Sequence, residues 1–392
     1  MTRARIVGSI ALLFVAGCAA LLAGGCSGAR PGAPRAGAGD ALPAAERARR
    51  PERLVLIAVP GLVPAHYLPA PGAAALAPQL AALAEGGVAV ESLRPVFPPA
   101  TVPALVSLVT GRPPASHGAV SLRALEAGGV GAPRPLAASA IEGRTLWQAV
   151  SLAGAAAASF DWPASEGSPA AQAPAPGSRA AEAAIAGADA QIGRLVACLR
   201  RAGRLESSAI VVAGDHGALP VHTAIRPNVA LAAVGLLTMN RDQAVGWAAL
   251  ARSNGGSAFV YAQDDDDALL ARRALEEAAR ETGVFRVVSA QEMLARGADP
   301  QAWFGLDAAP GWIFEDAVAG PRLGPASQRA AGGYAPGEPR MATGLVAWGA
   351  GFRPGVRVPE LRQVDVAPTL ALLLGVALDD AEGRALPGIL QP

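Results

Sequence analysis

The chain has 392 residues, of which 52% are hydrophobic, so it can bury the core of one large domain or of two ordinary ones. Its formal net charge of +1 argues against nucleic acid as a partner, because such proteins carry a marked basic excess. Only Cys198 lies beyond residue 26, so we expect no intrachain disulfide and a fold held by its core.

The first 26 residues resemble a bacterial lipoprotein signal. Two arginines precede an apolar run over residues 6–23, and small residues lead into Cys18 and again into Cys26. We expect Cys26 to be lipidated, with Cys18 as the alternative. An uncleaved membrane anchor is a further alternative, because the apolar stretch approaches the ~20 residues that span a bilayer. Each of these predicts an exported protein tethered to the bacterial cell envelope.

Residues 27–52 are rich in Pro, Gly, Ala and Arg and show no apolar periodicity, which predicts a flexible linker. The folded domain is expected over residues 53–392. Continuous apolar runs, typical of strands buried on both faces, alternate there with amphipathic segments that predict helices. Strands are expected at 53–61, 88–93, 156–160, 208–217 and 343–352, and helices at 73–86, 101–110, 145–154, 178–202 and 361–375.

This alternation predicts an α/β fold with a doubly wound, mostly parallel sheet flanked by helices, in which ligands bind beyond the carboxyl ends of the strands. Residues 220–325 are less regular and predict a smaller α+β subdomain, with strands at 257–263 and 285–289 and helices at 264–283 and 290–297. Four aspartates, Asp264 to Asp267, open one of these helices. We favour a helix N-cap over a cation site for them.

Residues 97–118, FPPATVPALVSLVTGRPPASHG, contain the first candidate functional residue. Thr101 follows two prolines and opens an apolar segment that ends at Gly111, which predicts a helix with a hydroxyl at its N-terminus. Positive potential at a helix N-terminus favours an anion or a developing alkoxide. Thr101 is therefore a candidate N-cap and a candidate nucleophile.

Asp215 and His216 form the second candidate, because they directly follow an apolar strand. A carboxylate and an imidazole at a strand tip can bind zinc together, and a metal ion can lower the pKa of a nearby hydroxyl. With a preceding strand that ends in Pro-Gly and a helix that opens with Thr101, they suggest a site at one edge of the sheet.

These segments resemble the alkaline phosphatase superfamily, and specifically the type I phosphodiesterase/nucleotide pyrophosphatase family. The resemblance implies a Thr or Ser nucleophile between two metal ions, usually zinc, held by six Asp and His side chains. Thr101 falls on the nucleophile, and Asp215 and His216 fall on two ligands of one metal. The matching segments, in the family's order, are residues 54–62, 77–88, 96–118, 145–154, 160–167, 187–199, 210–221, 348–355 and 364–375.

The chain departs from the family's pattern at the other ligands. Pro60 stands where a ligand Asp is expected, Gly332 stands where the last ligand His is expected, and residues 168–177 contain no titratable side chain where another Asp and His belong. Ala104 replaces an Asn that holds a phosphoryl oxygen in the family. Four of six metal ligands are thus missing, whereas a catalytic zinc normally keeps three protein ligands and an open position.

No obvious substitute ligand is present in the sequence. His66, His117 and His222 are the remaining histidines besides His216, and His117 matches a position that is structural in the family. His222 and Asp161 are weak candidates for replacement ligands. Asp189 matches a helix residue that is not a ligand in the family.

We therefore favour a pseudoenzyme in which Thr101 is a vestigial nucleophile that retains a capping role, and zinc binding is doubtful. One alternative is a residual one-metal phosphodiesterase or phosphatase that uses Thr101. A second alternative is a non-catalytic envelope scaffold or binding protein that contacts its partner through residues 220–325. The expected partners are the membrane, through the lipid anchor, and an unknown ligand or envelope protein.

Overall fold

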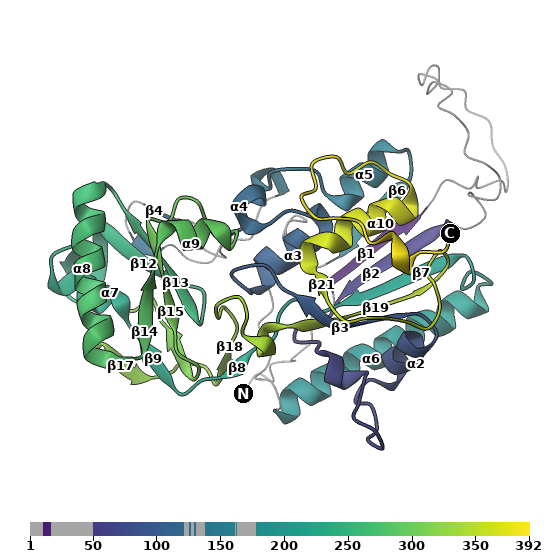
Figure 1. The fold of residues 1–392 in the computed structure, drawn as a ribbon, viewed down its shortest axis with the longest axis horizontal. Helices are drawn as coiled ribbons and strands as arrows, with labels where there is room; N and C mark the ends of the chain where they lie inside the picture. Colours follow the sequence, from purple (N-terminus) through teal and green to yellow (C-terminus); the bar gives the residue numbers. More distant parts are fainter. Residues whose placement is uncertain are drawn as a thin grey trace, which may run out of the picture.

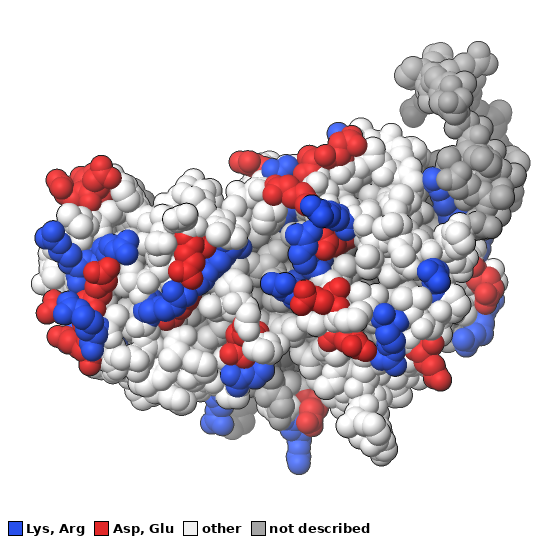
Figure 2. All heavy atoms as spheres, in the orientation of Figure 1, with Lys and Arg blue, Asp and Glu red and all other residues white. Residues whose placement is uncertain are grey.

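The computed structural model describes residues 11–16, 50–120, 125–126, 129–130, 138–160, 162 and 178–392, to which every structural statement below refers. Figure 1 shows a larger lobe built around a central sheet and a smaller lobe at the opposite end of the molecule, where α8 lies. On the face drawn in Figure 2, acidic and basic side chains are interspersed, in keeping with the net charge of +1. No helix of the described residues has the length and apolar character needed to cross a membrane.

The larger lobe contains an eight-stranded sheet with the order β20-β3-β19-β7-β2-β1-β6, in which β21 also pairs with β3. Its strands are β1 (Ala11–Ala16), β2 (Arg53–Ala58), β3 (Val88–Arg94), β6 (Ala156–Phe160), β7 (Ser208–Ala213), β19 (Thr343–Gly349), β20 (Val356–Val358) and β21 (Leu361–Arg362).

The α/β fold class is confirmed, and so is the mostly parallel sheet. β2 pairs parallel with β7, and β20 and β21 pair parallel with β3. β1 and β19 run antiparallel to both of their neighbours, so they are the two reversed strands in a sheet whose other six strands share one direction. An uninterrupted apolar run indicates that both faces of a strand are buried. Helices that cover both faces of a sheet bury parallel and antiparallel strands equally.

Helices cover both faces of this sheet, as Figure 1 shows. Alternate residues of β2 belong to different cores: Leu54 and Leu56 pack with one set of helices, and Val55 and Ile57 pack with the other. The first set is α3 (Thr101–Thr110), α5 (Leu146–Leu152) and α10 (Val366–Leu374), and the second is α2 (Pro78–Glu85) and α6 (Arg179–Arg201).

Several helix boundaries differ from the sequence expectations. α2 begins at Pro78 and not at residue 73, because proline fits the first helical turn. α10 begins at Val366, after β21 and a short 3₁₀ turn, Gln363–Asp365. α5 and α6 begin close to the expected residues, where Thr145 and Ser178 serve as N-caps.

Part of the predicted signal segment lies inside the sheet. β1 pairs with β2 on one side and with β6 on the other. Ala16 lies opposite Arg53, so this strand runs back along the whole length of β2. A processed chain that starts at Cys18 or Cys26 would lack β1, and β2 and β6 would then lose a common neighbour.

The smaller lobe has a separate apolar core beneath an antiparallel sheet of order β12-β13-β15-β14. Its main elements are β9 (Thr223–Ile225), α7 (Pro227–Ala233), β10 (Leu237–Asn240), β11 (Gln243–Trp247), β12 (Ala249–Ser253), β13 (Ser257–Ala262), α8 (Asp265–Thr282), β14 (Phe285–Val288), α9 (Ala290–Ala295), β15 (Phe304–Ala308), β16 (Trp312–Phe314) and β17 (Leu323–Pro325).

Shorter elements complete the chain. Two-residue strands β8 (Leu219–Pro220) and β18 (Ala330–Ala331) pair with each other, as do β4 (Leu125–Glu126) and β5 (Gly129–Val130). The short helix α4 spans Pro114–His117. At α8, the Asp264 side chain accepts a hydrogen bond from the Asp267 backbone N–H at 2.9 Å, so the expected N-cap is confirmed.

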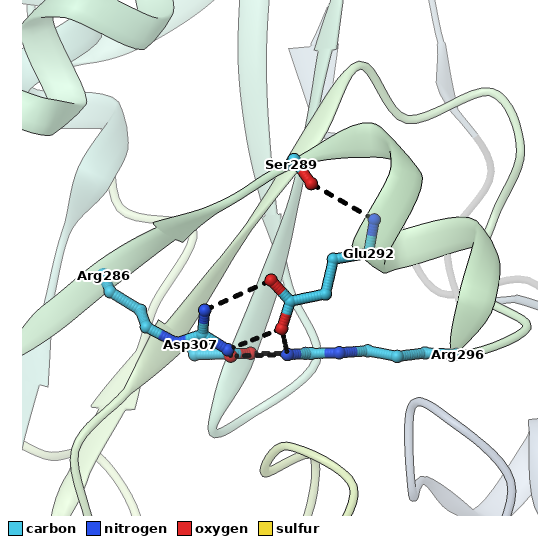
Figure 3. A network of polar contacts seen from close by, with 5 residues as sticks. All are labelled: Arg286, Ser289, Glu292, Arg296 and Asp307. Atoms are coloured by element: carbon cyan, nitrogen blue, oxygen red, sulfur yellow. Dashed lines mark hydrogen bonds and ion pairs between the residues drawn. The ribbon is translucent and has the colours of Figure 1, made fainter.

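Phe97, on the loop that enters α3, joins the two lobes. Its buried ring belongs to an apolar cluster of the smaller lobe, 5.9 Å from the Phe259 ring, and the Arg296 guanidinium lies 5.1 Å from its centroid. Figure 3 shows the polar network that holds Arg296, in which it and Arg286 both bind Glu292 and Asp307. The hydrogen bond from Arg286 is the main cause that lowers the pKa of Glu292 to about 2.

Candidate functional site

Thr101 is the first residue of α3, and its hydroxyl does not cap the helix. Ala100 occupies the N-cap position with an extended backbone, and no side chain caps the helix there. The Thr101 hydroxyl instead donates to Asp215 Oδ2 at 2.7 Å. The expected capping role of Thr101 is therefore wrong, because Thr101 is already the first helical residue and the N-cap position belongs to the residue before it. The expected helix end at Gly111 is confirmed, with φ of 69°.

Asp215 is fully buried beyond the end of β7, and its carboxylate is well supplied with donors. Oδ1 accepts the backbone N–H groups of Gly61 at 2.9 Å and His216 at 2.7 Å, and Oδ2 accepts the Thr101 hydroxyl. A buried carboxylate needs such partners to offset its lost hydration. Hydrogen bonds from the surrounding chain thus satisfy both oxygens of this carboxylate.

His216 turns its ring toward the same point. Its Nδ1 lies 2.7 Å from the Gly217 carbonyl oxygen, which can only accept, so Nδ1 carries a proton. Nε2 then faces Thr101 Oγ1 at 3.4 Å and Asp215 Oδ2 at 3.5 Å. The structure therefore brings together the three residues that the sequence singled out, with three of their polar atoms converging.

Gly332 lies against this group, and there is no room for a side chain there. A Cβ at Gly332 would lie 2.6 Å from His216 Nδ1 and 2.6 Å from the Pro99 carbonyl oxygen. The same carbonyl accepts the Gly333 backbone N–H at 2.9 Å. The chain has thus closed over the position where the resemblance places a histidine ligand, because backbone and the His216 ring now fill it.

The remaining ligand positions also lack donors. Pro60 follows β2 and has no side-chain atom that can coordinate a metal. Within the described ranges, no group of three or more His, Cys, Asp or Glu side chains is arranged to hold a metal ion. Residues 168–177 and Asp161 lie outside those ranges. The side chains that are present do not fit a pair of zinc ions, since each zinc normally takes at least three protein ligands.

Two titratable residues near the site have structural partners. The Asp189 carboxylate on α6 accepts the backbone N–H groups of Gln79 at 3.1 Å and Leu80 at 2.8 Å, so it satisfies the free end of α2. His117 is buried in a pair with Ser107 at 2.9 Å, and burial lowers the pKa of its ring to about 3.

The other two histidines also have local partners. His222 is exposed, pairs with the Thr223 hydroxyl at 2.8 Å and packs edge-on against Trp312. His66 accepts the Val63 backbone N–H at 3.2 Å, and partial burial lowers the pKa of its ring. No contact with Asp215 or His216 is present for either ring among the described hydrogen bonds, which gives no support to their use as replacement ligands.

Gln363 is a site residue that the sequence did not reveal. Its buried amide donates to the Asp215 carbonyl oxygen at 2.6 Å and accepts the Val96 backbone N–H at 3.1 Å. It therefore ties the end of β7 to the loop that leads into α3. The sequence shows only a glutamine between Arg362 and Asp365, and this does not identify its partners.

A cavity of about 310 Å³ adjoins the loop before α3. Its lining consists of most of the residues from 92 to 99 and from 334 to 342, together with Glu360. Pro99 lines this cavity, whereas Thr101, Asp215 and His216 do not. The cavity is thus separate from the group formed by Thr101, Asp215 and His216, although both features adjoin the loop before α3.

Comparisons with known proteins agree with this fold. The sequence model of a family described as type I phosphodiesterase/nucleotide pyrophosphatase matches residues 54–173 and 167–315. Human ectonucleotide pyrophosphatase/phosphodiesterase 5 superimposes with a TM-score of 0.66 at 15% identity, over 86% of this chain and 99% of that chain. The murine protein of the same name gives a TM-score of 0.67 at 16% identity, with the same coverage. No curated protein matches the chain.

Proposed function

The chain belongs to the type I phosphodiesterase/nucleotide pyrophosphatase family, and from this premise we propose that it is a non-catalytic member. It is exported and anchored by lipid at Cys26, or alternatively at Cys18, in the bacterial cell envelope. Thr101 is the vestige of a nucleophile. The cavity that adjoins the loop before α3 has a binding or purely structural role, and zinc is not a cofactor.

The packing at Gly332 carries this proposal. A missing ligand could in principle be replaced by another residue that reaches the same place. Here the place itself is filled by the Pro99 carbonyl oxygen and the His216 ring, each 2.6 Å from a Cβ at Gly332. The course of the backbone therefore leaves no space for a ligand side chain at that position.

The surroundings of the Thr101 hydroxyl also support the proposal of a non-catalytic protein. Phosphoryl transfer depends on positioned cations that neutralise charge in the transition state. Asp215 and Thr101 are joined by a 2.7 Å hydrogen bond, and the nearest cationic candidate, His216, is itself bound to a backbone carbonyl. These contacts give the Thr101 hydroxyl an adjacent acceptor but do not supply the cations that would neutralise the charge of a phosphoryl transition state.

One observation favours a second candidate, a one-metal phosphodiesterase or phosphatase that uses Thr101. Because Nδ1 of His216 is committed to the Gly217 carbonyl oxygen, Nε2 faces Asp215 Oδ2 and Thr101 Oγ1. Metal-binding histidines are oriented in the same way by a partner at the other ring nitrogen. Asp215, His216 and Thr101 would be the residues that hold such an ion.

Zinc content and hydrolytic activity, both measured on the full chain, distinguish the non-catalytic protein from the one-metal hydrolase. The protein is purified from membranes in detergent with zinc supplied, its zinc content is determined, and hydrolysis of bis-p-nitrophenyl phosphate is compared with that of Thr101→Ala. Thr238→Ala, at an exposed threonine of the smaller lobe, is the matched control. We expect less than stoichiometric zinc and the same background hydrolysis in all three proteins.

The opposite result would overturn the proposal. Stoichiometric zinc with turnover that disappears in Thr101→Ala but persists in Thr238→Ala identifies a one-metal hydrolase. Zinc without Thr101-dependent turnover would contradict the statement about zinc and leave the chain non-catalytic.

A further inference from the structure

A hollow of about 560 Å³ lies at the end of the molecule where the linker joins the fold. Arg50, Arg353, Leu372 and Leu390 are among its lining residues. Figure 1 shows the C-terminus, whose last residues also line the hollow, at the opposite end of the molecule from the smaller lobe. The hollow is therefore remote from α8 and α9.

Both arginines in this hollow have donors to spare. Arg50 Nη1 contacts the Leu374 carbonyl oxygen at 3.5 Å, and Arg353 Nη1 donates to the Gly388 carbonyl oxygen at 3.1 Å. Within the described part of the chain, neither pairs with a carboxylate, and no Asp or Glu side chain lines the hollow. Each guanidinium has five N–H groups, so most of them remain available for the oxygens of an anion.

The position of Arg50 depends on a glycine. A Cβ at Gly375 would overlap the Arg50 guanidinium, and Gly375 has φ of 66° as the residue that ends α10. Glycine is thus needed at this position both to end the helix in a left-handed conformation and to leave room for the arginine. Arg50 is in this way fixed beside the exposed end of α10.

Apolar side chains lie next to the arginines. Leu372 is 48% exposed although it belongs to a strongly apolar helix, and Leu390 is half-buried beside it. Exposed leucines with neighbouring arginines and no carboxylates are the combination that peripheral proteins present to an anionic membrane surface.

The linker places this surface within reach of a membrane, provided that the proposed lipid anchoring is right. From Cys26 to Arg50 the chain advances 24 residues, and a linker of the kind that their composition predicts would span roughly 25–30 Å on average. A tethered surface at such a distance meets the membrane at high effective concentration. Even a weak contact would then be populated.

We propose that this hollow binds the phosphate head group of an anionic phospholipid in the membrane that carries the anchor. Arg50 and Arg353 bind the phosphate oxygens, and Leu372 contacts the boundary of the acyl region. The smaller lobe then points away from the membrane.

The test uses the full lipidated chain reconstituted into vesicles of phosphatidylcholine, with or without phosphatidylglycerol. An environment-sensitive dye is attached at Leu372→Cys in a Cys198→Ser background, since Cys198 is exposed and free. The same dye at Leu294→Cys, an exposed position in the smaller lobe, is the control. We expect the emission at position 372, and not at 294, to shift only with phosphatidylglycerol.

Charge variants test the arginines themselves. Arg50→Gln with Arg353→Gln should lower the ratio of docked to undocked protein roughly 30-fold, as expected for two cationic contacts at an anionic surface. Arg273→Gln with Arg280→Gln removes the same charge from exposed positions of α8 in the smaller lobe and should leave the ratio unchanged. Equal losses from the two pairs would contradict the proposal.

The remaining outcomes separate this inference from the proposals on which it rests. A chain that sediments with the vesicles but shows no lipid-dependent change at position 372 overturns the docking alone. A chain that sediments with neither kind of vesicle overturns the anchoring and the docking together. A shift produced by inorganic phosphate on phosphatidylcholine vesicles assigns the hollow to a soluble phosphate and overturns the lipid assignment.

Discussion

At the scale of single residues, Asp215 links three segments of the chain. Its carboxylate is buried, yet the N–H groups of Gly61 and His216 and the Thr101 hydroxyl satisfy it. Each donor comes from a different segment of the chain, so the carboxylate holds the ends of β2, β7 and α3 together. The mutual contacts of Asp215, His216 and Thr101 therefore give these three residues a structural role.

The packing at Gly332 makes a prediction about stability. Gly332→Ala should lower the free energy of unfolding by about 1–3 kcal/mol, because the new methyl group meets the Pro99 carbonyl oxygen and the His216 ring. Gly187→Ala is the control, since it lies within α6 and a Cβ there meets nothing within 4 Å. Alanine should stabilise that helix by up to about 1 kcal/mol. Urea unfolding of both variants measures the difference, and a neutral Gly332→Ala would mean that the site is open.

His117 predicts a particular pH dependence of stability. Burial lowers the pKa of its ring from 6.5 to about 3 in the folded protein, so between these values the unfolded state binds a proton that the folded state does not. The stability that this ring contributes is complete above the unfolded pKa and is lost as the pH falls. The slope from this one group approaches about 1.4 kcal/mol per pH unit.

The measurement is the urea midpoint as a function of pH between those two pKa values. His117→Gln should be less stable at neutral pH, because the pairing with Ser107 is altered, but its stability should fall less steeply on acidification. His222→Gln, at an exposed ring, should keep the slope of the parent protein. Parallel slopes for the parent and His117→Gln would show that His117 titrates normally.

At the scale of elements, the loop that enters α3 is held by both lobes. Phe97 is packed in the smaller lobe's cluster, and Pro99 receives the Gly333 N–H. The Gln363 side chain accepts a hydrogen bond from the Val96 N–H of the same loop. The N-terminus of α3 is thus positioned by contacts with three distant parts of the chain.

The network in Figure 3 predicts unequal effects for its two arginines. Arg296 has a side chain that is only 10% exposed and contacts both Asp307 and the Phe97 ring, whereas the Arg286 side chain is 54% exposed. Arg296→Met should cost about 2–3 kcal/mol, because hydrogen bonds to the buried Asp307 carboxylate are lost. Arg286→Met should cost less than about 1 kcal/mol, as for other exposed ion pairs.

Urea unfolding of the two variants provides the comparison. A double-mutant cycle of Arg296→Met with Phe97→Leu then tests whether the network supports the loop, since contacting residues couple by about 0.5–3 kcal/mol. Additive costs in that cycle would show that the network stabilises only the smaller lobe.

For the whole molecule, the position of β1 conflicts with removal of the signal segment. The same six residues cannot pair with β2 and β6 and also be absent from the mature protein. We expect the protein extracted from membranes to begin at a lipidated Cys26, which its intact mass will establish and will distinguish from Cys18. A mass that corresponds to the full sequence would show that β1 is retained.

Hydrogen exchange tests the structural consequence. If the processed chain lacks β1, the amides of β6 should exchange faster than those of β7, which keeps both of its neighbours, β2 and β19. In an unprocessed Cys18→Ser, Cys26→Ser chain, β6 should be protected. Equal protection of β6 in both forms would indicate that β6 has moved to pair directly with β2.

The sequence by itself determined the fold class, the family and the identity of the three residues that meet at the site. These depend on apolar runs, on the order of motifs and on side-chain chemistry, all of which are local properties of the chain. It also indicated that Pro60 and Gly332 lack ligand atoms. It did not reveal which two strands, β1 and β19, are reversed in the mostly parallel sheet, because a run of buried apolar residues has the same composition in either direction.

Only the tertiary structure decided what those residues contact. It moved the Thr101 hydroxyl from the helix cap to Asp215, revealed Gln363, and showed that backbone atoms fill the space at Gly332. It also gathered Arg50 and Arg353 beside Leu372, although 303 residues separate the two arginines in the chain. These contacts join segments that are far apart in sequence. A local sequence pattern cannot predict which of these segments will lie side by side.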